Sequence, residues 1–371
     1  MHKRRRVLAA LPALALSTAL ALSLSASLSG CGALPPARNA ALDASVHSTL
    51  GAGFDGVVLV RAGKDGPTVS GAYGLADIAA ARPQQVHARF QVGSISKWIT
   101  SVAVLRLVEQ GKLALDAPVR NYLPELPEAS AGAVTVRHLL SNTSGIPDGV
   151  MAAFKQDKAV GALVLTPLQA SMRFGAGPSR FAPGSTFDYS VTNWVVTAAL
   201  VERVTGARFM DVIAQQVFRP ACLRASGFAQ AGFDAAPDVA LAYGSTPPRA
   251  LKMPPTGAFA AASGTVYSTA QDLATLAQAV FDGTMLSAAS RAELSRIMVP
   301  AQDYALGGRV RTMTLGSVAR TVAYESGSTG GYKALLLHVH GEGKTVVILN
   351  NTDMAQGELE KAGVALLGSL Y

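Results

Sequence analysis

Ser94 and Lys97 are the residues of this 371-residue chain whose types and spacing point most directly to chemistry. Residues three apart on a helix share a face, so the hydroxyl of Ser94 and the amine of Lys97 can meet there. A serine hydroxyl is a poor nucleophile at neutral pH unless a base takes its proton, and a lysine desolvated in a pocket can supply that base. The pair therefore indicates nucleophilic catalysis, with simple N-capping by Ser94 as the structural alternative.

One helix, expected within Phe90 to Gly111, must position this pair. Its apolar residues recur at helical spacing and Gly111 is a C-cap candidate. Those apolar residues are Ile95, Ile99, Val102, Leu105 and Val108. Ser94 falls at the expected start of the helix, where free N–H groups and the positive end of the helix dipole stabilise a developing oxyanion.

Strands are predicted toward both ends of the chain and helices between them. The predicted strands cover residues 54–61, 68–74, 309–315, 318–325, 332–340 and 344–350. Helices are predicted at residues 40–50, 193–206, 209–218, 268–281 and 355–367. The strand patterns and the turns between them predict an α/β domain made of residues 40–111 and 263–371, with residues 112–262 inserted as a mostly helical domain.

The N-terminus has the pattern of an export signal. Residues 2–6 (HKRRR) are basic, an apolar run follows from Val7 to about Leu28, and small residues lead up to Cys31. The ending Leu-Ser-Gly-Cys31 resembles the lipobox of bacterial lipoproteins. We therefore expect residues 1–30 to be a signal peptide, diacylation of Cys31, a tether over 31–39, and a lipid-anchored protein of the bacterial cell envelope facing the periplasm. A plain secretory signal and an uncleaved membrane anchor are the alternatives.

Composition excludes several other classes. Only four of the 32 Lys and Arg residues fall in the signal, so the remaining excess over 24 acidic residues is four, too small and scattered to indicate a nucleic-acid partner. No second segment approaches the roughly 18 apolar residues of a membrane span. Cys222 is the one cysteine besides Cys31, and its neighbours predict a small buried hydrophobe.

No motif calls for a metal or an organic cofactor. His338 and His340 alternate on a predicted strand with Asp353 nearby, but this spacing matches no metal site. Gly343-Lys344-Thr345 lacks the upstream glycine of a phosphate-binding loop. We therefore expect neither.

Several blocks of the chain, in order, resemble the serine β-lactamase and penicillin-binding-protein superfamily, specifically its class C branch. That branch includes class C β-lactamases, D,D-carboxypeptidases, D-aminopeptidases and β-lactamase-like (family VIII) esterases. The matching blocks are Phe90-x-x-Gly-Ser-x-Ser-Lys97, Gly111-Lys-Leu-Ala-Leu-Asp116, Val136-Arg-His-Leu-Leu-Ser-Asn-Thr-Ser-Gly-Ile146, Phe181-x-Pro-Gly-x-x-Phe-x-Tyr-Ser190, Ala262-Ser-Gly-Thr-Val-Tyr-Ser-Thr-Ala-Gln-Asp272 and Ser326-Gly-Ser-Thr-Gly-Gly331. The resemblance implies an α+β fold, an antiparallel sheet flanked by N- and C-terminal helices, with the site at the seam with the helical domain.

The resemblance also implies roles for individual residues. Ser94 would be the nucleophile, with Lys97 and Tyr189 managing the protons. The backbone N–H groups of Ser94 and Ser328 would hold the oxyanion. Asn193, which matches a common family position, would contribute to substrate binding, with capping of the next helix as the structural alternative.

Two positions depart from the family motifs. Val191 stands where the Tyr-x-Asn motif has its amide, and Glu325-Ser326-Gly327 stands where the third motif has a base followed by a small residue and Gly. Glu325, Ser326 and Gly327 would border the substrate, and we expect a Glu325 carboxylate to repel the carboxylate of a β-lactam or cell-wall peptide. Both departures favour esters, neutral amides or substrates with an amino group.

The leading hypothesis is thus a serine hydrolase that forms an acyl-enzyme on Ser94, esterase-like first and amidase-like or D-aminopeptidase-like next. Hydrolysis of β-lactams or D,D-peptidase action on cell-wall peptides is the alternative. A third hypothesis is a non-catalytic scaffold that binds wall peptides or a protein partner, because two of the three motifs are altered.

Overall fold

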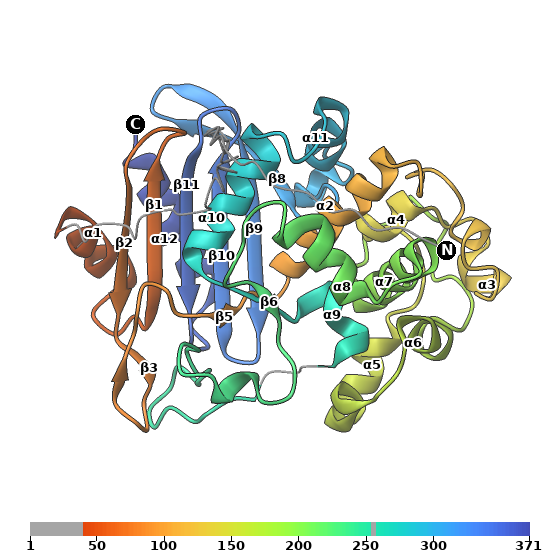
Figure 1. Ribbon diagram of the computed structural model, residues 1–371, viewed down its shortest axis with the longest axis horizontal. Helices are drawn as coiled ribbons and strands as arrows, with labels where there is room; N and C mark the ends of the chain where they lie inside the picture. Colours follow the sequence, from red (N-terminus) through yellow and green to blue (C-terminus); the bar gives the residue numbers. More distant parts are fainter. Residues whose placement is uncertain (1–39, 254–256) are drawn as a thin grey trace, which may run out of the picture. The chain divides into compact units, whose positions relative to one another are not determined.

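Strands from the two ends of the chain pair into one six-stranded antiparallel sheet, in the order β2-β1-β11-β10-β9-β8 (Figure 1). The computed structural model describes residues 40–253 and 257–371, so the expected signal peptide, the tether and Cys31 lie outside the described residues. The strands are β1 (Gly56–Ala62), β2 (Thr68–Tyr73), β8 (Arg309–Leu315), β9 (Val318–Thr329), β10 (Tyr332–Val339) and β11 (Lys344–Asn350). The early and the late strands meet where Gly56 of β1 lies opposite Asn350 of β11.

Helices cover both faces of this sheet. α1 (Ala40–Leu50) and α12 (Gln356–Gly368) pack on one face, and α2 (Ile95–Glu109) and α10 (Ala270–Ala277) pack on the other. Because successive side chains of a strand point to opposite faces, β10 supplies both cores: Leu336 faces α2 and α10, whereas Leu335 and Leu337 face α1 and α12.

The remaining helices form a second layer beside α2, as Figure 1 shows. They are α3 (Glu128–Ala131), α4 (Val136–Leu140), α5 (Gly149–Gln156), α6 (Pro167–Phe174), α7 (Val191–Thr205), α8 (Phe209–Ile213), α9 (Ala261–Gly264) and α11 (Ala288–Ser295). α2 contacts β9 on one side and α8 and α9 on the other. The fully buried Trp98 of α2 and Trp194 of α7 show how completely this seam excludes water.

Short elements complete the chain. A small sheet runs in the order β5 (Phe90–Gln91), β7 (Val266–Ser268), β6 (Gly227–Phe228), and a two-stranded ribbon pairs β3 (Leu75–Asp77) with β4 (Arg82–Pro83). β5 leads directly into the start of α2, and its pairing with β7 brings the segment that follows α9 beside that start.

The predicted fold class is confirmed by this arrangement, with differences in detail. β9 runs to Thr329, four residues beyond the predicted strand, because Ser328 and Thr329 pair with Lys333 and Tyr332 of β10. The predicted helix at 209–218 begins as α8 and continues as a π-helical turn. Cys222 is exposed, so the prediction that it is a buried hydrophobe was wrong.

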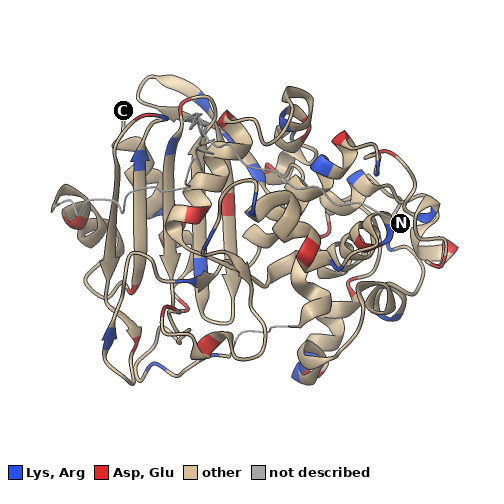
Figure 2. Ribbon diagram, in the orientation of Figure 1, with Lys and Arg blue, Asp and Glu red and all other residues tan. Residues whose placement is uncertain are grey.

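In the described part of the chain, neither the distribution of charged residues nor the length of the helices marks out a special surface. Figure 2 shows basic and acidic residues interspersed over the sheet and the helices. In residues 40–253 and 257–371, no helix combines the length and the apolar character that crossing a membrane requires.

Candidate active site

Ser94 lies at the N-terminal end of α2, and its hydroxyl is engaged by two other side chains. The residue has helical φ and ψ values of −63° and −11°, and its side chain makes no capping hydrogen bond. Its Oγ instead accepts hydrogen bonds from the hydroxyl of Tyr189 at 2.7 Å and from the Nζ of Lys97 at 3.3 Å. The structural alternative of a simple N-cap therefore does not describe this serine.

Lys97 is buried directly beneath the hydroxyl of Ser94, with only 2% of its surface exposed. Its Nζ donates a 2.6 Å hydrogen bond to the carbonyl oxygen of Ser263 in α9 and lies 4.9 Å from the centroid of the Tyr189 ring. These contacts fix the amine between the nucleophile and the phenol. Ser94 Oγ accepts from both groups, so the proton of Ser94 can leave once either Lys97 or Tyr189 has lost its own.

Tyr189 comes from the loop before α7, and polar contacts anchor the backbone that follows it. The N–H of Ser190 donates to the Oδ1 of Asn142 at 3.3 Å, and the Oγ of Ser190 caps α7 by accepting from the N–H of Asn193. Tyr189 as a whole remains 40% exposed, so a bound substrate can reach it.

Two glycines bring the N–H groups of Ser94 and Ser328 together. Gly93 has a φ of 52°, and a side-chain carbon there would lie 2.6 Å from the backbone nitrogen of Ser328. A side-chain carbon at Gly327 would overlap the carbonyl oxygen of Val92 and lie 3.1 Å from the nitrogen of Ser94. Within the described residues, the N–H of Ser94 donates no hydrogen bond. Both N–H groups are thus placed as the two donors of an oxyanion site.

Asn193 lies beneath the site, away from any substrate. It is 1% exposed, its Oδ1 accepts a 2.6 Å hydrogen bond from Ser144, and its Nδ2 donates to Asn142. The structure therefore places Asn193 in a buried network under the Tyr189 loop rather than in the substrate-binding position that we expected. Its contribution there is to hold that loop.

Glu325 is also buried, with 4% of its surface exposed. Its carboxyl group packs so closely on Gly308 that a side-chain carbon at Gly308 would overlap both carboxyl oxygens. Burial raises the pKa of Glu325 to about 8, and the charge of Arg309 only partly opposes this. At neutral pH burial thus favours the uncharged acid, so the expected repulsion of a substrate carboxylate has no basis in this geometry.

Ser326 follows the alternation of β9 and points to the opposite face of the sheet, toward α12. Gly327 lies on the face that meets α2, where it permits the close approach of the strand to Val92 and Ser94. Of the three residues expected to bind substrate in this strand, Gly327 is the one that the structure brings against the nucleophile.

A cavity of about 650 Å³ opens above Ser94, Lys97 and Tyr189. Val191, at the position of the missing amide, lines it, as does Ser328. Most of its other side chains are apolar. Of the two further lysines in the lining, Lys252 lies 3.2 Å from the carboxylate of Asp353, and Lys158 lies 4.2 Å from the centroid of the Phe154 ring. The apolar lining residues include Val150, Met151, Phe154, Val160, Met253 and Phe259. The space above the nucleophile therefore fits an uncharged organic group.

Sequence reasoning missed several residues of the site. The carbonyl of Ser263 and the amide of Asn142 lie inside matched sequence blocks, but nothing in the sequence assigns them contacts with Lys97 and the Tyr189 loop. No sequence signal singled out Tyr304, which packs against Tyr189 from the segment before β8.

This fold and site define a class of proteins in which a Ser-x-x-Lys serine lies between a sheet and a helical layer and is paired with a tyrosine. A family model described as Beta-lactamase matches residues 42–368. The chain belongs to this family.

Individual relatives cover parts of the chain. Esterase EstB of Burkholderia gladioli is 37% identical over 171 residues, which are 43% of this chain and 43% of the esterase. A D-aminopeptidase of Cereibacter sphaeroides is 33% identical over 200 residues, which are 51% of this chain and 35% of that enzyme. The match therefore spans less than half the length of each of these two relatives.

Solved structures match over most of the chain. The penicillin-binding protein from Bacillus halodurans superposes with a TM-score of 0.73 at 24% identity, covering 89% of this chain and all of that one. At this level of identity the likeness establishes the fold.

Proposed function

We propose that this protein is a serine hydrolase of the class C β-lactamase-like branch that acts through an acyl-enzyme on Ser94. The observation that carries the proposal is the Ser94 hydroxyl held by both Lys97 and Tyr189, facing a cavity. Attack by Ser94 on a carbonyl carbon would transfer the serine proton to Lys97 or Tyr189, and Tyr189 would deliver a proton to the leaving group.

The oxyanion that forms during attack would be held by the N–H groups of Ser94 and Ser328. One such donor typically lowers the barrier by about 3 kcal/mol. Expulsion of the leaving group leaves an acyl group on Ser94, and attack by water through the same oxyanion releases the acid. The residues named here carry out every step, and the scheme calls for no metal or cofactor.

An ester of a small uncharged acyl group is the substrate class that we propose. Val191 and the apolar lining of the cavity favour such a group. The esterase and D-aminopeptidase relatives support ester or amide substrates of this kind. Amide substrates are the second subclass, since the acyl-enzyme chemistry is the same.

Hydrolysis of β-lactams or of D,D-peptides is the second candidate function. The observation that favours it is the burial of Glu325, because a neutral carboxyl outside the cavity does not repel an anionic substrate. Relatives named as penicillin-binding proteins are consistent with this alternative.

The test is to measure hydrolysis of p-nitrophenyl butyrate and of a chromogenic cephalosporin by the wild type and by Ser94→Ala. Ser48→Ala, at an exposed position of α1, is the matched control. We expect ester turnover that falls by at least roughly a thousandfold in Ser94→Ala and is unchanged in Ser48→Ala.

The other outcomes of this test are equally informative. Cephalosporin turnover above ester turnover would favour the second candidate. Turnover of neither substrate would favour a scaffold that binds without catalysis. Turnover that survives in Ser94→Ala would contradict an acyl-enzyme on Ser94.

We further propose that Cys31 carries a lipid that anchors the protein in the cell envelope, facing the periplasm. The Leu28-Ser-Gly-Cys31 sequence after an apolar run supports this. Metabolic labelling with an alkyne fatty acid should mark the wild type and not Cys31→Ala. Label that persists in Cys31→Ala would contradict the anchor.

A further inference from the structure

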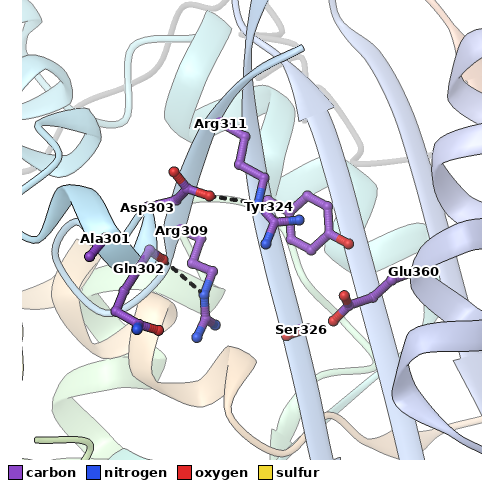
Figure 3. A pocket seen from close by; sticks show the side chains of 8 residues that line it. All are labelled: Ala301, Gln302, Asp303, Arg309, Arg311, Tyr324, Ser326 and Glu360. Atoms are coloured by element: carbon purple, nitrogen blue, oxygen red, sulfur yellow. Dashed lines mark hydrogen bonds and ion pairs between the residues drawn. The ribbon is translucent and has the colours of Figure 1, made fainter.

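A second, polar cavity of about 320 Å³ opens where β8 begins beside β9, on the side of α12 (Figure 3). It shares no lining residue with the cavity above Ser94. Its lining residues are Ala301, Gln302, Asp303, Arg309, Arg311, Tyr324, Ser326 and Glu360.

Four of these residues carry charge, and two of them already satisfy each other. The Nε of Arg311 lies 3.0 Å from the Oδ2 of Asp303, and its guanidinium stacks 3.9 Å from the centroid of the Tyr324 ring. This ion pair forms one wall of the cavity. Its charges are therefore not available to a ligand.

The two other charges have no ionic partner within the described residues. Arg309 donates its Nε to the carbonyl oxygen of Gln302 at 3.2 Å, which leaves its two terminal nitrogens without a protein acceptor there. Glu360 forms no ion pair in that part of the chain. Its carboxylate does interact with the hydroxyl of Tyr324, and burial together with this carboxylate raises the pKa of Tyr324 to about 12.

Both of these charges are half-buried and line one cavity without pairing with each other. Figure 3 shows the guanidinium of Arg309 and the carboxylate of Glu360 on either side of Ser326. Half-buried charges lose part of their hydration, and neither of these two gains the hydrogen-bonded ion pair that would offset the loss. A ligand with one negative and one positive group would give each of the two charges an ionic partner.

We propose that this cavity binds an α-amino carboxylate, with the ligand carboxylate on Arg309 and its ammonium group on Glu360. A guanidinium offers two parallel donors that match a carboxylate, and a carboxylate is the natural acceptor for an ammonium group. Ser326 lines the cavity between the two charges and can offer its hydroxyl to the ligand, whereas the hydroxyl of Tyr324 is already engaged by Glu360. A dianion such as phosphate is disfavoured, because the carboxylate of Glu360 would repel it.

The α-amino carboxylate in this cavity can come from two sources, a free amino acid or the leaving group of a substrate held on Ser94. Ser326 precedes Ser328 by two residues, which is about 7 Å along a strand. β8 pairs with β9 only as far as Tyr324, opposite Arg309, so the stretch of β9 between the two cavities has no β8 partner. A leaving group that passes over this edge of β9, from the face of α2 to the face of α12, would reach Arg309. This second source rests on the proposed hydrolase, and the first does not.

The first arm of the test measures binding without turnover. Calorimetric titration of the Ser94→Ala protein with alanine is compared with propionate, which lacks the amine, and ethylamine, which lacks the carboxylate. We expect alanine to bind at least tenfold more tightly than either, and Arg309→Gln and Glu360→Gln each to weaken it at least tenfold. Glu358→Gln, an exposed acid on the same helix, is the matched control and should change nothing.

The second arm measures kinetics with two butyrate esters. O-butyrylserine releases serine, whose α-amino and carboxylate groups are free, whereas ethyl butyrate releases a neutral alcohol. We expect Arg309→Gln and Glu360→Gln to raise KM for O-butyrylserine at least tenfold and to leave ethyl butyrate unchanged.

A response in the first arm identifies a free amino acid as the ligand, and a response in the second arm alone identifies the leaving group. If alanine binds no better than propionate and ethylamine, and neither variant separates the two esters, the proposal is wrong. If the proposed hydrolase function is wrong, ethyl butyrate will not be turned over. The calorimetric measurement of alanine binding does not depend on turnover and still tests this proposal.

Discussion

Tyr304 packs edge-on against Tyr189, with ring centroids 6.4 Å apart and an angle of 89° between the ring planes. The Nδ2 of Asn142 donates a 2.8 Å hydrogen bond to the hydroxyl of Tyr304, and the Oδ1 of the same amide accepts from the N–H of Ser190. Burial raises the pKa of Tyr304 well above its usual value, so the phenol stays protonated. A buried tyrosine and one amide thus set the position of the phenol beside Ser94.

We predict that Tyr304→Leu lowers kcat about tenfold or more while KM changes little, because Tyr189 loses the ring that holds it. Tyr304→Phe keeps the ring and removes the acceptor for Asn142, so it should cost about 1 to 3 kcal/mol of stability and leave kcat within a few-fold. Steady-state kinetics and urea unfolding of the wild type and the two variants measure these effects. Wild-type kcat in Tyr304→Leu would show that Tyr304 does not position Tyr189.

A second prediction concerns Glu325 and pH. Burial raises the pKa of this carboxyl from the ordinary 4.5 to about 8. Between these values the native protein holds a proton that the unfolded chain has released, so this group makes stability fall as pH rises from about 4.5 to about 8. The amide in Glu325→Gln does not titrate.

The stability of Glu325→Gln relative to the wild type should therefore increase between pH 5 and pH 8, by a few kcal/mol. Urea unfolding of both proteins at the two pH values measures this difference. The contributions of all other titrating groups are the same in both proteins and therefore cancel in the difference. Glu358→Gln, at an exposed position, should show no such increase. A difference that is the same at both pH values would mean that Glu325 is ionised in the folded protein at neutral pH.

The sequence could locate Ser94, Lys97 and Tyr189 because local patterns carry them: a spacing of three on one helix, and matched blocks around each residue. It could also indicate that Ser326 faces away from Glu325 and Gly327, since strand residues alternate. That inference requires β9 to continue past residue 325. The stretch from Ser326 to Thr329 is polar and glycine-rich, so its sequence does not predict the strand that the structure shows there.

The state of Glu325 could not be predicted in this way. Its burial depends on Gly308, which comes from the segment before β8 and has no Cβ to fill the space that the carboxyl group occupies. The support of Tyr189 by Tyr304 likewise joins two segments far apart in the chain. Such contacts follow from tertiary packing, which no local pattern encodes.

Gly327 gives a third prediction. A methyl group at this position would overlap the carbonyl oxygen of Val92 and crowd the nitrogen of Ser94, so Gly327→Ala must push β9 away from α2. The two oxyanion donors would then separate, and we expect kcat to fall about a hundredfold. Gly357→Ala, in α12 with open space around the added carbon, is the matched control and should keep full activity. Normal kcat in folded Gly327→Ala would mean that the N–H of Ser328 does not serve the oxyanion.

The last prediction concerns the acyl group. If the apolar cavity above Ser94 holds the acyl chain, each buried methylene contributes up to about 0.8 kcal/mol, so kcat/KM for p-nitrophenyl esters should rise from acetate to hexanoate. Val191 lines this cavity, and its replacement by Asn introduces an amide that must remain hydrated or find a partner. We expect Val191→Asn to lower the hexanoate-to-acetate ratio of kcat/KM about tenfold, and Val191→Ile to preserve it. Val164→Asn, at a position that is 98% exposed, controls for the substitution itself. A ratio that Val191→Asn leaves unchanged would place the acyl chain elsewhere, and the ester leaving group would then be the better candidate for this cavity.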